Sequence, residues 1–244
     1  LLASSAASDV YKRQHMHTME AYTTLYEATH KEVHKRALQE IIDIVLKHMV
    51  DYDFWCGRNQ FSIDFTPKPA ISIRRTWNYD RDPESANKNP LDTTSYGHNI
   101  ELIWLLNRAY EVLGLPPARE FTRKFADYTL ANGWDNIHGG IYRDGMHDGR
   151  IVVTDKEWWQ NFESLTGFLD SYQATEDERY LDTFIKLWEF DKKYFYNPEV
   201  GESRQLLLAD GTPVIDDTGN QWKCIYHTDR AMMECCLRIE SLTE

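Results

Sequence analysis

The sequence lacks the features that would place the protein in a membrane, on nucleic acid or in an oxidising compartment. No uninterrupted apolar run approaches the ~20 residues needed to cross a bilayer. Lys and Arg number 27 against 39 Asp and Glu, and they form no basic stripe, so neither nucleic acid nor an anionic membrane is an expected partner. The four cysteines show no C-x-x-C pair and no regular spacing, which argues against a zinc knuckle or a disulfide framework. A reducing compartment, the cytoplasm, is therefore the expected location.

What is present is an ordinary globular composition with an excess of aromatic side chains. Hydrophobic residues make up 42% and charged residues 27% of the 244 residues, which is typical of a protein that buries a core. Tyr, Phe and Trp together reach 13%, and the eight tryptophans are the unusual part of that total.

The first 14 residues, LLASSAASDVYKRQ, are not expected to belong to the fold. They have no basic n-region and too few apolar residues for a signal peptide. The run SSAASDVYKRQ resembles the translation of a sequencing adaptor, and a natural disordered tail is the alternative. We expect residues 1–14 to be adaptor-derived and residues 15–244 to be the C-terminal part of a single longer domain.

Apolar residues recur at three- and four-residue spacing over most of the chain, which predicts amphipathic helices. Gly114, followed by two prolines, predicts the end of the third helix. The expected helices span residues 15–29, 32–50, 95–113, 117–132, 155–174, 177–195 and 226–241. Short strands are expected at residues 60–66, 71–77, 139–142 and 203–208.

The predicted helices alternate in character along the chain. The first, third, fifth and seventh carry His, Trp and Glu near their N-terminal ends, whereas the others are plain amphipathic helices rich in charge. This indicates an inner ring of helices that lines a cavity and an outer ring that faces solvent. Helical hairpins with β excursions favour an all-α toroid over a four-helix bundle, whose loops are usually short.

Two His–Glu pairs with three-residue spacing are candidate site residues. His98 and Glu101 share a face of the third helix, as His17 and Glu20 do on the first, so each carboxylate can orient the imidazole and tune its pKa. A purely structural N-terminal polar pair is the alternative. No H-E-x-x-H pattern occurs, so neither a metal nor any other cofactor is expected.

Two clusters rich in tryptophan complete the set of candidates. Trp158 and Trp159 point about 100° apart on a helix, so one can face the core and the other a cavity. Trp222 and His227 lie where a loop enters the last helix, followed by Arg230.

Four motifs in order carry a resemblance to a known family. HMHTMEAYTTLY at 15–26, GHNIE at 97–101, KEWWQNFE at 156–163 and WKCIYH at 222–227 together resemble the N-acylglucosamine 2-epimerase and cellobiose 2-epimerase family. WKCIYH is more similar to the cellobiose branch. The resemblance implies an (α/α)6 barrel of twelve helices, of which this chain would hold about the last seven.

The resemblance also implies a two-base epimerisation of a sugar through a cis-enediolate. His98 and His227 would exchange the proton on C2, His17 would assist ring opening, and Glu101 would hold His98. Histidine suits this role because an unperturbed pKa of ~6.5 lets one imidazole accept and another donate near neutral pH. The implied substrate contacts are Trp158, Trp159, Trp222, Glu163 and Arg230.

The chain departs from the family pattern at a few positions beside the proposed catalytic atoms. Asn99, Asn161 and Ile225 replace residues common in the cellobiose branch, and Arg13 stands where the family has an asparagine. A sugar-contacting arginine expected from the family's N-terminal half is absent, which removes one stabiliser of the enediolate charge. We therefore expect the chain by itself to be inactive.

The expected function is a sugar 2-epimerase that interconverts glucose and mannose at the reducing end of a β-1,4-linked disaccharide. The alternatives are an aldose–ketose isomerase of the same superfamily, a glycoside hydrolase on the same toroid, and a glycan- or protein-binding module. The expected partner is a small-molecule carbohydrate, and the expected state is a monomer or homodimer.

Overall fold

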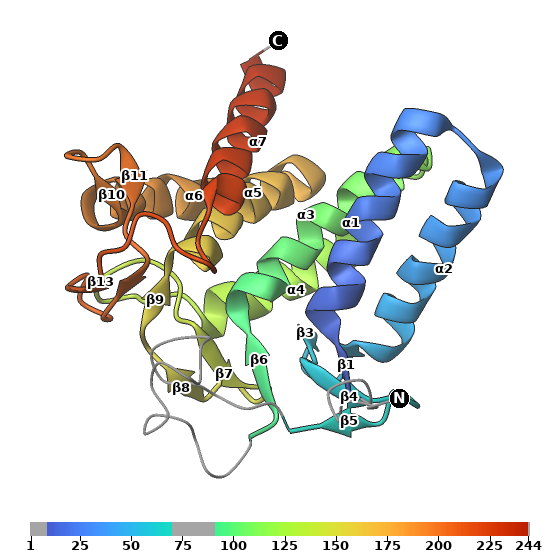
Figure 1. Ribbon diagram of the computed structural model, residues 1–244, viewed down its shortest axis with the longest axis horizontal. Coiled ribbons are helices and arrows are strands. Elements are labelled where there is room, and N and C mark those ends of the chain that lie inside the picture. Colours follow the sequence, from blue (N-terminus) through green and yellow to red (C-terminus); the bar gives the residue numbers. More distant parts are fainter. Residues whose placement is uncertain (1–8, 70–90, 244) are drawn as a thin grey trace.

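The computed structural model describes residues 9–69 and 91–243, and these residues form seven α-helices joined by loops and short strands (Figure 1). The helices are α1 (Lys12–Thr29), α2 (Glu32–His48), α3 (Tyr96–Val112), α4 (Arg119–Asn132), α5 (Trp158–Thr175), α6 (Glu178–Phe190) and α7 (Ile225–Thr243), and α6 continues into a π-helical turn, η3 (Asp191–Phe195). Their order and positions confirm the predicted set. None of these helices is both long and apolar enough to cross a membrane.

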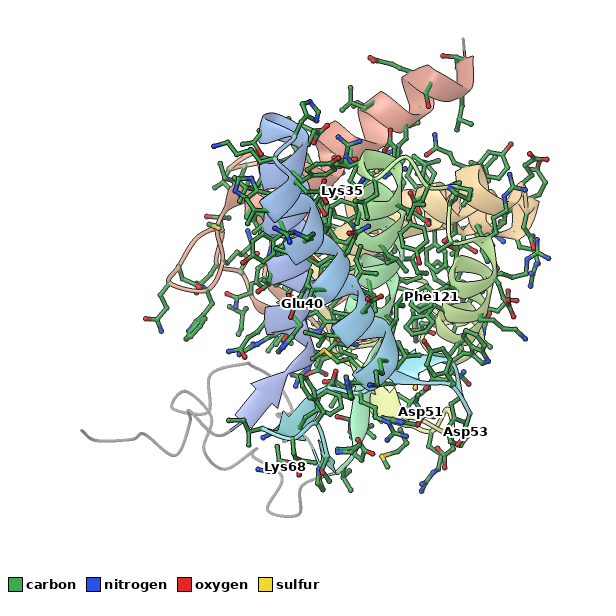
Figure 2. The ribbon with its side chains drawn as sticks, turned by 90° about the vertical axis from the view of Figure 1, so that its right-hand side faces the viewer. Lys35, Glu40, Asp51, Asp53, Lys68 and Phe121 are labelled. Atoms are coloured by element: carbon green, nitrogen blue, oxygen red, sulfur yellow. The ribbon has the colours of Figure 1, made fainter. Side chains whose placement is uncertain are left out.

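The helices pair into hairpins and form an inner and an outer layer. Helix α1 packs on α2, α3 on α4 and α5 on α6, while α1, α3, α5 and α7 pack on one another in that order. Helices α3 and α5 are buried along nearly their whole length, whereas α2, α4 and α6 bury one face. Figure 2 labels an exposed residue of α2, Glu40, and a buried one of α4, Phe121. This arrangement confirms the predicted all-α class, with seven helices of an (α/α)6 barrel.

Short antiparallel strands gather where the inner helices begin (Figure 1). Strand β1 (Asp9–Tyr11) leads into α1, β6 (Thr93–Ser95) into α3, and β9 (Lys156–Glu157) into α5. Because each strand is hydrogen-bonded to a neighbour, the first turns of these helices are held in place. The sheets have the orders β1-β4-β5, β2-β3, β6-β7-β8, β13-β12-β9 and β10-β11. The remaining strands are β2 (Val50–Asp51), β3 (Cys56–Gly57), β4 (Gln60–Ser62), β5 (Pro67–Lys68), β7 (Asp144–Met146), β8 (Ile151–Val153), β10 (Tyr196–Asn197), β11 (Glu202–Ser203), β12 (Leu206–Leu207) and β13 (Pro213–Ile215).

Helices α3 and α5 approach each other closely where each carries a glycine. A Cβ on Gly97 would lie 2.4 Å from Cγ of Gln160, and a Cβ on Gly167 would lie 2.3 Å from Cγ2 of Ile100. Neither helix could keep this position with a larger residue, because protein interiors are close-packed. Gly97 therefore lets the first turns of α3 and α5 meet, and Gly167 lets Ile100 pack against the middle of α5. The first turns carry most of the predicted site residues.

The expectation that residues 1–14 stand outside the fold differs from the structure over residues 9–14. Strand β1 pairs with β4, and α1 begins at Lys12, three residues earlier than predicted. Lys12 is buried, and its Nζ donates to Oδ1 of Asn99 at 3.0 Å. These contacts are tertiary, so the composition of the segment gave no sign of them. The adaptor origin of the segment stays a prediction, and the strand predicted at 71–77 lies outside the described residues.

Candidate active site

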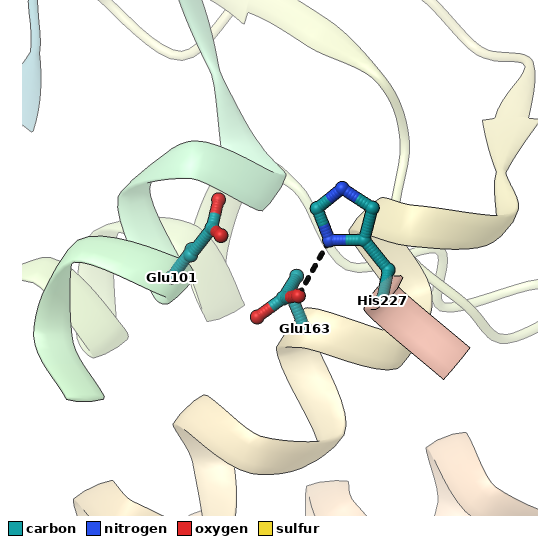
Figure 3. Close-up of side chains that lie close together, drawn as sticks. All are labelled: Glu101, Glu163 and His227. Carbon is teal, nitrogen blue, oxygen red and sulfur yellow. Dashed lines mark hydrogen bonds and ion pairs between the residues drawn. The ribbon is translucent and has the colours of Figure 1, made fainter. Parts of the chain in front are cut away.

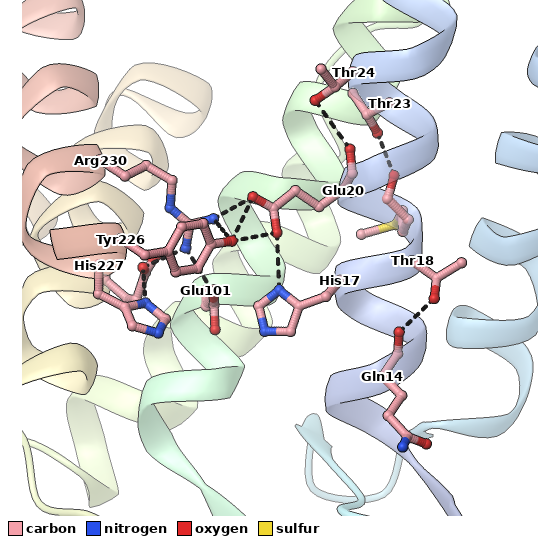
Figure 4. A network of polar contacts seen from close by, with 12 residues as sticks. Gln14, His17, Thr18, Glu20, Thr23, Thr24, Glu101, Tyr226, His227 and Arg230 are labelled. Carbon is pink, nitrogen blue, oxygen red and sulfur yellow. Dashed lines mark hydrogen bonds and ion pairs between the residues drawn. The ribbon is translucent and has the colours of Figure 1, made fainter. Parts of the chain in front are cut away.

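The centre of the candidate site is the guanidinium of Arg230, which joins carboxylates from three other helices. Figure 4 labels two of them, Glu20 and Glu101. Its Nη2 lies 2.9 Å from Oε1 of Glu101 on α3 and 2.5 Å from Oε1 of Glu163 on α5. Its Nη1 donates to Oε1 of Glu20 on α1. The side chains of Glu101 and Glu163 are fully buried. One cation therefore compensates three carboxylates and ties α1, α3, α5 and α7 together.

Aromatic rings enclose this guanidinium on α3 and α7. Its central carbon lies 4.8 Å from the ring centroid of Trp104 and 4.1 Å from that of Tyr226, both within range of a cation–π interaction. The Tyr226 hydroxyl donates to Oε2 of Glu20 at 2.7 Å. Burial disfavours the charge, but the carboxylates, Glu163 first, outweigh it and raise the pKa of Arg230 above its usual value. The guanidinium is therefore always charged.

His227, near the start of α7, faces Glu163 (Figure 3). Its Nδ1 lies 2.6 Å from Oε1 of Glu163, and Oε2 of the same carboxylate accepts the indole N–H of Trp104 at 3.1 Å. Burial raises the pKa of Glu163, but the hydrogen bond with His227 and the charge of Arg230 outweigh it and hold that pKa below its usual value. An ionised Glu163 favours the His227 tautomer with its proton on Nδ1, which leaves Nε2 for proton exchange.

His98, in the first turn of α3, occupies an environment of opposite character. The residue is 7% exposed, and Ser95 caps the helix by accepting the His98 backbone N–H at 3.4 Å. Burial, with the positive charges of Lys12 and His17, holds the pKa of His98 well below its usual value. His98 is therefore neutral near pH 7, as a general base must be.

The indole of Trp159 packs against both histidines. Its ring centroid lies 4.5 Å from that of His98 and 5.6 Å from that of His227. Trp158 makes an edge contact with His227 at 6.3 Å, and both tryptophans are buried. Trp222, by contrast, is 57% exposed in the loop before α7, so the structure does not bring it together with them.

His17 and Glu20 form the predicted pair on α1. Nδ1 of His17 lies 2.9 Å from Oε2 of Glu20. Burial opposes the charged imidazole, but the hydrogen bond to Glu20 and the charge of Glu101 outweigh it and raise the pKa of His17. The side chain is 36% exposed, so His17 can exchange protons with solvent.

Glu101 has a different partner from the one predicted for it. The ion pair that the structure shows is with Arg230 on α7, and the role of Glu101 in holding His98 stays a prediction. Burial and the nearby charge of Glu163 raise the pKa of Glu101 to about 7. The pKa of Glu101 is thus raised and that of Glu163 is lowered, as happens when two acids share one site.

The raised pKa of Glu101 predicts how stability depends on pH. Between its unfolded pKa of 4.5 and its folded pKa of about 7, the folded chain holds a proton that the unfolded chain has released, so stability falls as pH rises through this window. Glu101→Gln removes this loss. We expect the difference in free energy of unfolding between variant and parent to grow in the variant's favour by about 3 kcal/mol from pH 4.5 to pH 7, measured by urea denaturation. The contribution of His98 is common to both proteins and cancels. A pH-independent difference would show that Glu101 ionises normally.

In the part of the chain that the structure describes, one group of three His, Cys, Asp or Glu side chains has the spacing of a metal site. It consists of Glu101, Glu163 and His227. Their potential ligand atoms lie within 4.8 Å of one another. Nη2 of Arg230, however, contacts both carboxylates. The guanidinium thus supplies the positive charge that a metal would bring, and these residues do not fit a metal ion.

Sequence reasoning found most of the residues that meet here but missed several of their partners. His98, His227, Trp158, Trp159, Glu101, Glu163 and Arg230 lie together, and His17 joins them through Glu20 and Arg230. The spacing to His17 identifies Glu20 but assigns it no role. Trp104 follows Glu101 by one helical turn, and this spacing could have identified it. Tyr226 had no signal beyond its place next to His227.

Comparisons with known proteins show which proteins the chain is similar to. The family model for N-acylglucosamine 2-epimerase (GlcNAc 2-epimerase) matches residues 3–231. The chain is 29% identical to cellobiose 2-epimerase of Ruminococcus albus in an alignment that covers 91% of this chain and 52% of that protein. The solved structure of cellobiose 2-epimerase from Bacillus thermoamylovorans B4167 matches with a TM-score of 0.76 at 25% identity, over 96% of this chain and 55% of that one. A D-mannose isomerase matches in fold, with a TM-score of 0.77 at 20% identity, over 94% of this chain and 56% of that one. The chain spans about half the length of the curated relatives it matches.

Proposed function

The chain belongs to the N-acylglucosamine 2-epimerase family, and from that membership we propose that the protein is a sugar 2-epimerase. Its substrate is the reducing-end glucose or mannose of a short oligosaccharide, a β-1,4-linked disaccharide. The motif WKCIYH and the relative from Ruminococcus albus, which bears the name cellobiose 2-epimerase, support this substrate.

The observation that carries the proposal is a pair of histidines with different surroundings packed against one indole. His98 is buried and held neutral by its surroundings, whereas His227 is hydrogen-bonded to an ionised carboxylate. Two imidazoles in different surroundings near one carbon, one to take a proton and one to return it, are what inversion at C2 requires.

The family resemblance and the positions of these side chains support the following chemistry. His17, partly exposed and paired with Glu20, assists opening of the sugar ring. One of the two histidines, His98 or His227, takes the C2 proton. The C2–H electron pair forms the C1=C2 double bond and the C1 carbonyl π pair moves onto O1, which gives the enediolate. The other histidine returns a proton to C2 from the opposite face, which inverts that carbon. Trp158 and Trp159 pack on the C–H faces of the sugar.

The rival function is aldose–ketose isomerisation, which shares the enediolate but returns the proton to C1. The likeness to the D-mannose isomerase is one of fold alone, so it does not favour that reaction. Arg230 bears on the expected inactivity of the chain alone, because its charge is already compensated by three carboxylates. It offers little free positive charge to an enediolate, which supports the expected inactivity of the 244-residue chain by itself.

The test compares two proteins. One is this chain alone, and the other is a fusion in which this chain follows the N-terminal part of the Ruminococcus albus enzyme that lies outside the alignment. Both are incubated with cellobiose and with mannose in D2O and followed by NMR. We expect the fusion to produce a mannose-terminated disaccharide with deuterium at C2, and the chain alone to produce none. Fructose from mannose would replace the epimerase proposal by the isomerase, and free glucose from cellobiose would replace it by a hydrolase. A folded fusion with no activity on either sugar would also overturn the proposal.

A further inference from the structure

A chain of buried charges leads from the β7–β8 hairpin to the indole that contacts both histidines. The guanidinium of Arg143 is 1% exposed, and its Nε donates to Oδ2 of Asp144 at 2.8 Å. Its Nη1 lies 3.7 Å from Oε1 of Glu157, which is 3% exposed. The other carboxylate oxygen of Glu157 accepts the indole N–H of Trp159 at 2.5 Å.

The backbone on which this carboxylate stands is fixed independently. Glu157 lies in β9, where it pairs with Leu206 of β12 in a three-stranded sheet. It is also the residue immediately before α5, in extended conformation with φ −96° and ψ 143°. Glu157 therefore reaches Trp159 from a strand held by main-chain hydrogen bonds, and its side chain is held in turn by Arg143.

The indole has only two side-chain torsions and one hydrogen-bond donor. A hydrogen bond at the N–H edge, added to a fixed backbone, sets the plane of the ring. That ring lies 4.5 Å from His98 and 5.6 Å from His227, so a rotation of the indole would move the surface against which both imidazoles rest.

We propose that Glu157 is a positioning residue of the site: its carboxylate holds the indole of Trp159 against His98 and His227, and Arg143 anchors that carboxylate. The consequence for catalysis rests on the proposed epimerase function, but the geometric role does not. Because proton transfer to carbon depends steeply on placement, a displacement of about 1 Å can cost about 10²-fold in rate.

Two substitutions separate positioning from simple charge balance. Glu157→Gln keeps an oxygen that can accept the indole N–H, whereas Glu157→Leu fills the space and leaves that N–H without its acceptor. Asp170→Asn is the matched control. Asp170 is likewise a buried carboxylate paired with an arginine, Arg238 at 2.8 Å, but it lies within α5, about 16 Å along the helix from Trp159.

The first readout is NMR of the 244-residue chain and needs no activity. We expect Glu157→Leu to shift the Trp159 indole N–H signal upfield and to shift the ring C–H signals of His98 and His227. Glu157→Gln should retain the indole hydrogen bond and shift the histidine signals far less, and Asp170→Asn should leave all three unchanged. If Glu157→Leu does not fold, the indole N–H signal of Glu157→Gln still tests the contact.

The second readout is activity of the fusion. We expect Glu157→Leu to lower kcat about 10²-fold with little change in KM, and Glu157→Gln to recover most of that loss. If Glu157→Leu lowers stability as Asp170→Asn does but leaves the histidine signals in place, Glu157 only balances Arg143 and the proposal is wrong. An inactive parent fusion would overturn only the proposed epimerase function, because the NMR measurement tests the positioning role of Glu157 without any activity.

Discussion

Replacing Arg230 with methionine lowers the free energy of unfolding of the 244-residue chain by about 3–5 kcal/mol near neutral pH. The reason is the burial of its partners: Glu101 and Glu163 are fully buried, and Glu20 is 22% exposed. Methionine fills much of the space but leaves these carboxylates without the charge that compensates them. Removing one member of a buried ionic cluster is strongly destabilising because the other charges stay buried without compensation. Replacing all members by apolar residues costs far less.

The matched control is Arg108→Met on α3. Arg108 also pairs with two carboxylates, Glu27 and Glu111, but these are 47% and 70% exposed, so we expect a loss of only about 0–1 kcal/mol. Urea denaturation of both variants measures the difference. The Arg230→Met loss should also shrink as pH falls from 7 to 5, because protonated carboxyls no longer need the guanidinium. Equal losses in the two variants would show that the Arg230 cluster is not a buried one in solution.

The helices could be predicted because their signals are local. The apolar period marks α2 and α6, and Gly114 with a φ of +72° ends α3 where it was expected to end. The start of α1 could not be predicted, because it depends on the pairing of β1 with β4 and on the burial of Lys12, both of which are long-range contacts. Local composition made the same residues look foreign to the fold.

In the site too, local sequence signals identify individual residues but not the long-range contacts between them. The family resemblance named Glu101, Glu163 and Arg230 separately, but no spacing rule joins residue 101 to residue 230. The expected carboxylate for His98 was therefore its neighbour on the same helix, whereas the ion pair that forms is with a residue from α7. Glu157 carries no local sequence signal for a related reason: its role depends on the hydrogen bond to Trp159 and on Arg143, which lies just before β7.

Replacing either His98 or His227 with glutamine in the fusion is expected to lower the rate of C2 inversion by about 10²–10⁴-fold, the usual contribution of a positioned acid or base. Each variant should nonetheless keep one half of the reaction. If the two imidazoles serve opposite faces of C2, the remaining histidine can still remove and return the proton of the one epimer that presents it, and that position then exchanges with D2O without inversion.

The decisive feature is the pattern across the two epimers. The His98→Gln fusion and the His227→Gln fusion should exchange deuterium into opposite members of the glucose-ended and mannose-ended pair, followed by NMR of each disaccharide separately. His34→Gln is the control, since His34 lies near the start of α2, where its Nδ1 hydrogen-bonds with Thr29, and it should invert C2 at the parent rate. A binding module would show no exchange in any of these proteins. Exchange into the same epimer by both variants would mean that both histidines serve one face of the sugar. Neither the buried, neutral His98 nor the carboxylate-paired His227 would then protonate the opposite face, and inversion would need another acid.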